Sequence, residues 1–197
     1  MVARGQTAAA FVTRKSGRGV RQYAEGRAAA GALAQLAGAA AMACAAAGLL
    51  LFGGTAASAA SNKVRMTNLS DVAFGTIANL NVDAVRNESL CLYADTSSLG
   101  YNITATGTGA GGAFQLSSGA GSMAYDVEWS SAAGQSSGTQ LTPNVPLTGQ
   151  TSSATHQTCN NGPAATASLI LVVRSTALSS AAAGTYGGSL TLLVGPE

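Results

Sequence analysis

The sequence predicts an all-β protein, built as a sandwich of short strands. From about Ser61 onward, short runs of alternating apolar and polar residues recur along the chain, separated by residues that favour turns. Alternation with a period of two is typical of strands that are buried on one face only. No stretch of this part shows the sustained periodicity of a helix with a charged face. These observations together favour two packed sheets over a helical fold.

About seven strands can be assigned from the alternation. In the run 100–106, Tyr101, Ile103 and Ala105 share one face, and in the run 123–129 Trp129 falls on the inward face and is predicted to lie in the core. The run 168–173 is continuously apolar and is therefore expected to be a central strand. The remaining predicted strands are 64–67, 88–93, 114–116 and 189–194, with loops at 130–140 and 148–164 and a short helical turn within 177–183. About seven short strands are typical of an immunoglobulin-like sandwich.

Charge divides the chain into two parts of opposite sign. Residues 1–27 carry six basic residues and one acidic residue, a net charge of +5, and residues 28–60 carry none. Residues 61–197 carry four basic and seven acidic residues, a net charge of −3. Because the basic excess lies in the front part, the sequence gives no basis for nucleic-acid binding by the rest.

The front part, residues 1–60, reads as a secretory signal peptide with a long basic n-region. An apolar run ends at Phe52, a Gly-Gly pair follows, and small residues surround a cleavage-like sequence at 57–59 or 58–60. Because the n-region is long, the start codon could lie downstream of Met1. The alternative is a permanent membrane anchor, since residues 28–52 are long enough to cross a bilayer. We expect export, with residues 61–197 as the mature domain and no membrane contact after the signal is removed.

Two cysteines, Cys91 and Cys159, fall in the mature part, and an exported chain with two cysteines most simply forms one disulfide. Closing a loop of this length would stabilise the fold by roughly 4 kcal/mol. Two free thiols or a metal pair are the alternatives. With His156 as the single histidine, the available ligands fall short of a closed zinc site, so no metal is predicted.

No constellation of catalytic residues can be found in the mature part. His156 stands in a polar loop, and the G-x-S-x-G string at 134–138 lies in a Ser/Gly-rich loop without the helix that a nucleophile elbow needs. Asp126 and Glu128 share the outer face of one predicted strand, which is usually a solvated surface. A glycine run at 107–112 is followed by another predicted strand rather than by a phosphate-binding helix. We therefore expect no enzyme activity and no cofactor, with a hydrolase as the least favoured hypothesis.

Four segments of the mature part, in this order and spacing, resemble the spore coat protein U-like family, the subunits of archaic chaperone–usher pili. They are Asn68-Leu69-Ser70-Asp71-Val72-Ala73-Phe74-Gly75; Cys91-Leu92-Tyr93-Ala94 with the strand 101–107; Cys159-Asn160-Asn161-Gly162; and Gly184-Thr185-Tyr186 with the alternating run to Val194. The likeness covers nearly all of residues 61–197.

The resemblance implies an incomplete immunoglobulin-like sandwich that lacks its last strand and receives a donor strand from a partner. Leu190, Leu192 and Val194 would lie on the edge strand of the acceptor groove. The implied partners are a periplasmic chaperone, an outer-membrane usher and neighbouring pilus subunits, and the implied location is the periplasm in transit and then the fimbrium, cell surface or medium. The implied role is structural, in adhesion or biofilm formation.

The position in the fibre depends on what precedes the first strand. After cleavage near Ala59, only Ser61, Asn62 and Lys63 precede it, and a donor extension needs roughly ten or more alternating residues. The sequence therefore favours a tip or accessory subunit over a shaft subunit. The alternative is a secreted adhesin module, binding a surface or a glycan outside any fibre.

Overall fold

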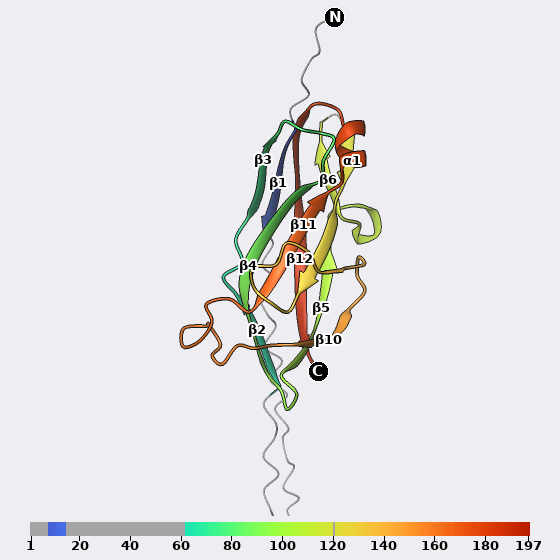
Figure 1. Ribbon diagram of the computed structural model, residues 1–197. Helices are drawn as coiled ribbons and strands as arrows, with labels where there is room; N and C mark the ends of the chain where they lie inside the picture. The colour runs from blue at the N-terminus through green and yellow to red at the C-terminus, as the bar shows by residue number, and fades with distance from the viewer. Residues whose placement is uncertain (1–7, 15–61, 120) are drawn as a thin grey trace, which may run out of the picture. The chain divides into compact units, whose positions relative to one another are not determined.

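The computed structural model describes residues 8–14, 62–119 and 121–197, of which residues 8–14 are described by their backbone alone. These residues form two packed sheets, which confirms the predicted all-β sandwich (Figure 1). One sheet has the strand order β10-β5-β12-β1-β3, with β6 pairing β12 and β7 pairing β6. The other has the order β2-β4-β11-β8-β9. All pairings are antiparallel except that of β1 with β12, which is parallel.

The described residues contain twelve strands, a 3₁₀ turn (Ala110–Gly112) and one short helix, α1 (Ser175–Ser180). The strands are β1 (Ala8–Arg14), β2 (Lys63–Thr67), β3 (Val72–Ile77), β4 (Ala84–Asp95), β5 (Gly100–Thr106), β6 (Gln115–Ser118), β7 (Gly121–Ala124), β8 (Asp126–Ser130), β9 (Thr139–Gln140), β10 (Leu147–Thr151), β11 (Ala167–Val173) and β12 (Gly184–Pro196).

The structure has more strands than the seven or so that the alternation indicates. Part of the difference arises because one predicted strand, 123–129, is divided into two. The run 123–129 keeps its alternation, and Met123, Tyr125, Val127 and Trp129 are all buried. The chain nevertheless crosses between sheets at Tyr125, so that β7 belongs to one sheet and β8 to the other. Alternation with a period of two indicates which side chains are buried, but it does not indicate which strand the backbone pairs with.

The core lies between the two sheets and contains Trp129, as the sequence predicts. Its indole Nε1 donates a hydrogen bond of 2.9 Å to the hydroxyl of Tyr101, and the two rings meet edge to face with centroids 6.3 Å apart. Trp129 comes from β8 in one sheet and Tyr101 from β5 in the other. This pair therefore ties the sheets together by packing and by a buried hydrogen bond.

Strand β11 is central, as its continuous apolar run predicts, because it pairs with β4 on one side and β8 on the other. Its outer face is covered by the loop that contains the G-x-S-x-G string. The backbone N–H groups of Gly134 and Gln135 donate to the hydroxyls of Ser89 and Ser168, both at 3.0 Å. Ile170, on the same outer face, is fully buried. The string thus belongs to a covering loop held by serine hydroxyls, and not to a strand-to-helix turn.

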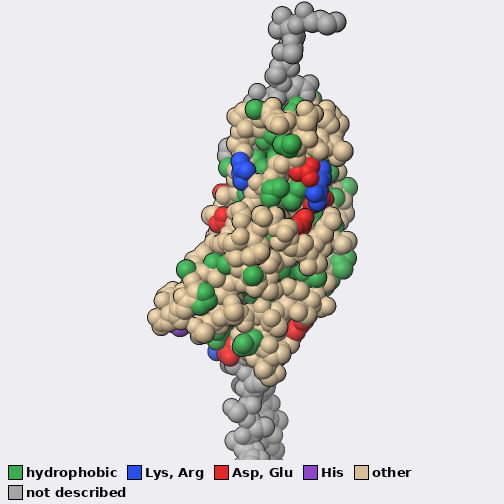
Figure 2. All heavy atoms as spheres, viewed as in Figure 1, with side chains coloured by type: hydrophobic (Ala, Val, Ile, Leu, Met, Phe, Trp, Pro, Cys, Tyr) green, Lys and Arg blue, Asp and Glu red, His purple; other side chains and the backbone are tan. Residues whose placement is uncertain are grey.

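The surface carries few charges. On the face drawn in Figure 2, neutral side chains predominate, and the few charged ones are scattered apart from one group of both signs near the upper right. Within the described ranges, no helix is long and apolar enough to cross a membrane. The predicted signal peptide falls outside the described residues, apart from residues 8–14.

Candidate functional site

The feature that stands apart in this fold is the strand β1. Its residues 8–14 lie between β12 and β3, and they are separated in sequence from the next described residue by the stretch 15–61. Figure 1 shows β1, in blue, beside β3. A parallel neighbour cannot be reached through a tight turn, and here nearly the whole domain separates β1 from β12 along the chain. We call the space that β1 fills the β3–β12 slot, bounded by the backbones of 72–77 and 184–190.

One wall of the slot is the first half of β12. Residues Gly184 to Leu190 pair in parallel with Ala8 to Arg14, over seven register positions. On its other side β12 pairs with β5 through residues 191–196 and with β6 at Gly187. The Tyr186 hydroxyl donates to the carbonyl of Ala182 at 2.9 Å, and the ring is buried. This wall therefore stays anchored in the sheet whatever occupies the slot.

The three residues that the sequence places on the edge of an acceptor groove divide between two neighbours. Leu190 is buried and lies opposite Arg14, at the end of the slot. Leu192 and Val194 are only partly buried, and they pair with Ala105 and Ile103 of β5. The stretch of β12 that borders the slot thus begins earlier, at Gly184, and ends where the predicted edge begins.

The other wall is β3, which differs from β12 because β1 is its only strand partner among the described residues. Five register positions join β1 to β3, and the register shifts where Ala10 lies opposite Gly75 and Phe11 lies opposite Ala73. Phe74 is the extra residue of this β-bulge, and Gly75 has a φ of 68°, a conformation that suits glycine. Val72, Phe74 and Ile77 point into the core, so the bulge switches the inward face from even to odd positions.

The chemistry of the slot is that of β-augmentation. With β1 in place, the main-chain groups of both walls are paired; without it, two facing edges would present unpaired N–H and C=O groups above an apolar core. In β-augmentation an extended segment completes such ladders with its main chain, and its alternate side chains enter the core. The slot is therefore a site for an extended peptide strand.

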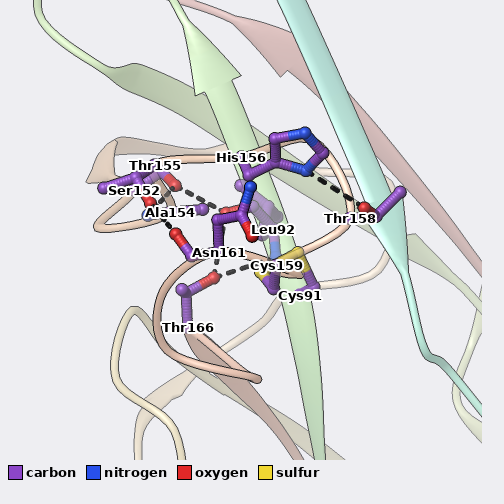
Figure 3. The surroundings of a disulfide bond; sticks show 10 residues. All are labelled: Cys91, Leu92, Ser152, Ala154, Thr155, His156, Thr158, Cys159, Asn161 and Thr166. Atoms are coloured by element: carbon purple, nitrogen blue, oxygen red, sulfur yellow. Dashed lines mark hydrogen bonds between the residues drawn. A yellow bond between two sulfur atoms is a disulfide. The ribbon is translucent and has the colours of Figure 1, made fainter.

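The disulfide joins Cys91 to Cys159, the pair expected from the sequence, with a sequence separation of 68 residues (Figure 3). Both sulfurs are buried, and Cys159 anchors the long polar loop to β4. The same loop is bonded to β4 at Leu92, whose carbonyl accepts hydrogen bonds from the hydroxyls of Ser152 at 2.5 Å and Thr166 at 2.9 Å. One covalent link and two buried hydrogen bonds thus hold the loop between β10 and β11, which connects the two sheets, against β4.

His156 lies on the exposed part of this loop, where its Nδ1 is 3.1 Å from the hydroxyl of Thr158. Figure 3 joins the His156 ring to that hydroxyl, two residues along the same loop. Within the described part of the chain, no group of three or more His, Cys, Asp or Glu side chains could hold a metal ion.

Asp126 and Glu128 face outward from β8, as their alternation predicts, but they are not isolated charges. Arg174 contacts both, with Nε 2.6 Å from the Asp126 carboxylate and Nη2 3.5 Å from that of Glu128, and its Nη1 is 3.0 Å from Asp83. The backbone N–H of Ser175 and then the Arg174 guanidinium lower the pKa of Asp83 below its ordinary value. This cluster fixes the start of α1 to the outer face of the sheet.

Comparison of the chain with protein-family models, with curated proteins and with solved structures found no match. The fold and the β3–β12 slot are therefore the features from which the function is inferred.

Sequence reasoning missed both the slot strand and one wall. Residues 8–14 lie in the predicted signal peptide, and their sequence, five apolar residues followed by Thr-Arg, lacks the alternation that indicates the other strands. The β3 segment enters the sequence argument only as part of a family motif, because its bulge breaks the period of two. The signal that could have found β3 is a glycine inside a short apolar run, since such a glycine often marks a bulge.

Proposed function

We propose that residues 61–197 form a structural subunit of a chaperone–usher surface pilus, whose sandwich is completed by an extended strand from a partner. The β3–β12 slot is the observation that carries this proposal. The strand that fills it comes from residues 8–14, which the sequence assigns to a segment removed on export. If that removal occurs, β3 loses its strand partner, and another strand has to take the place of β1.

The surroundings of the slot support a protein partner of this kind. Main-chain hydrogen bonds along both walls would supply affinity, and the buried side chains beneath the slot would supply pockets for alternate residues. The single disulfide suits an oxidising compartment such as the periplasm. The partners would be a periplasmic chaperone in transit, then an outer-membrane usher and a neighbouring subunit.

A tip or accessory position follows if processing occurs near residue 60. The first described strand of the mature domain, β2, begins at Lys63. A subunit that receives a strand but has no extension of roughly ten residues to donate ends a fibre rather than extends it. Mass spectrometry of the mature N-terminus tests this position, and a start ten or more residues upstream of Ser61 would contradict it.

The proposed function is tested by producing the exported chain with and without a periplasmic chaperone of a chaperone–usher system. We expect a one-to-one complex with the chaperone, and degradation or aggregation in its absence. A protease-resistant monomer that begins near Ser61 and is produced alone would refute the proposal.

A matched variant separates a missing strand from a general folding defect. In this variant, residues 61–197 are followed by about 20 Gly/Ser residues and then by residues 8–14, a linker long enough to return along β12. The added segment can enter the slot parallel to β12, as β1 does. We expect this self-completed chain to be a stable monomer without any chaperone.

A further inference from the structure

Strand β3 would have no hydrogen-bonded neighbour in its sheet whenever the slot is empty, because β1 is its only strand partner among the described residues. The opposite wall, β12, keeps its pairing with β5 and β6 in that state. A strand that binds the slot needs both walls in position. The question is therefore what holds β3 in place before a strand arrives.

Two polar contacts join β4, in the opposite sheet, to β3 and to the segment just before it. Arg86 Nη2 donates a hydrogen bond of 3.0 Å to the carbonyl of Phe74, and the guanidinium carbon lies 5.9 Å from the centre of the Phe74 ring. The Ser70 hydroxyl, just before β3, donates to the Glu88 carboxylate. Arg86 and Glu88 lie on the same face of β4 as the buried Leu90, which is the face toward β3, with Arg86 exposed and Glu88 half-buried.

The carbonyl that Arg86 binds belongs to the one residue of β3 that has no register partner in β1. Phe74 is the bulged residue, left out of the register between β1 and β3. A second Arg86 hydrogen bond, from Nη1 to the carbonyl of Val85 at 2.8 Å, holds the guanidinium in its own strand. The contact between Arg86 and Phe74 is made with β1 in the slot, so it does not compete with a strand there.

We propose that Arg86 is a positioning residue that braces β3 against β4 while the slot is empty, so that an incoming strand meets a preformed edge. The inference rests on the proposed function, because it concerns the same slot. Preorganised walls reduce the ordering cost of binding, and the apparent affinity for a strand falls with the fraction of molecules in which β3 is in place.

The test uses the full chain with a specific protease site inserted between residues 15 and 61. The chain is cut after folding and oxidation, so that β1 becomes a non-covalent strand. A fluorescent peptide of residues 6–16 is then exchanged into the slot, and its association and dissociation rates are measured. The variants are Arg86→Ala, Arg86→Lys and, as a matched control, Arg65→Ala on the neighbouring strand β2.

We expect Arg86→Ala to slow association about tenfold and to change dissociation less than about twofold, because the brace acts on the empty state. Arg86→Lys should fall between, since an ammonium cannot hold both carbonyls in the way a guanidinium does. Arg65→Ala should match the unmodified chain. An association rate unchanged by Arg86→Ala, or a change confined to dissociation, would overturn the inference.

Two further outcomes are distinguishable. If Arg86→Ala does not fold, Arg86→Lys carries the same test, and an association rate equal to that of the unmodified chain would refute the brace. If the peptide binds none of the chains, the slot does not bind an added strand and the proposed function itself fails.

Discussion

Reduction of the Cys91–Cys159 disulfide should lower the free energy of unfolding by about 4 kcal/mol. The cross-link closes a loop with a sequence separation of 68 residues. In the chain-entropy model, loops of about 15 and about 100 residues correspond to about 3 and about 4.7 kcal/mol, and this loop lies between them. The effect arises in the denatured chain, whose freedom the cross-link restricts.

Urea unfolding with and without a reductant measures this difference. With a slope of about 2 kcal/mol per molar urea, reduction should lower the midpoint by about 2 M. Reduction is preferable to substitution, because both thiols stay packed beside Ala154 and no cavity is created. The measurement is made on a Cys44→Ala background, which leaves only the pair of interest.

A midpoint that falls by less than about 0.5 M, with both thiols shown to be labelled, would refute this reasoning. It would mean that the cross-link barely restricts the denatured chain. Hydrogen exchange adds a local readout, because the buried hydroxyls of Ser152 and Thr166 still bond Leu92 after reduction. We therefore expect amides near residues 155–163 to exchange sooner than those of Leu92 and Thr166.

Four further predictions use single substitutions, measured by urea midpoints or by the pH dependence of stability. Tyr125→Phe should leave the free energy of unfolding unchanged or raise it by about 1 kcal/mol, because the buried hydroxyl has no hydrogen-bond partner among the described residues. Tyr101→Phe should instead lower it by about 1 to 3 kcal/mol, because the Trp129 indole N–H would be left unpaired. Burial raises the pKa of Tyr125 to about 12, so the folded state should lose stability as the pH rises from about 10 to 12, and Tyr125→Phe should lose less. Asp83→Asn should reduce the acid sensitivity below pH 3.8, because a lowered pKa means that Asp83 stabilises the fold above that pH and stops doing so as the pH falls through its folded pKa. Gly75→Ala should cost about 1 to 2 kcal/mol through its positive φ, whereas Gly184→Ala, which also meets no atom within 4 Å, should be close to neutral.

Each of these predictions has a result that contradicts it. A loss of more than about 1 kcal/mol in Tyr125→Phe would show that the hydroxyl has a partner. Parallel acid titrations of Asp83→Asn and the unmodified chain would show that the contact with Arg174 does not depend on protonation. Equal costs at Gly75 and Gly184 would show that the bulge is not strained by a side chain.

The fold class and the core could be read from the sequence because both depend on which side chains are buried. Strand β5 has the range that the alternation indicates, and Trp129 is buried, as its position in the alternating run 123–129 predicts. The pairing of the cysteines followed from their number, since only one pair is available after the front part. These inferences need no knowledge of which strands are neighbours.

The slot could not be read from the sequence, because it depends on pairing between segments far apart in the chain. Its parallel pairing brings Ala8 opposite Gly184, and no local pattern reports such a contact. Its second wall, β3, does not show a regular alternation, because the bulge at Phe74 and Gly75 moves the buried positions from even to odd numbers within a six-residue strand. Leu192 and Val194 were assigned to a groove edge by resemblance, and the structure pairs both with β5.

If residues 1–60 are removed as predicted, β1 is removed with them, and β3 of an isolated molecule loses its strand partner. With β1 present, the slot strand makes five register positions with β3 and seven with β12. Without it, every backbone group of β3 that faces the slot needs water or another strand, and each group that is left buried and unpaired costs about 1 to 3 kcal/mol. A few such groups would consume most of the stability of an ordinary domain of about 5 to 15 kcal/mol. We therefore expect a processed domain that is stable to contain a strand from elsewhere, as the proposed function requires.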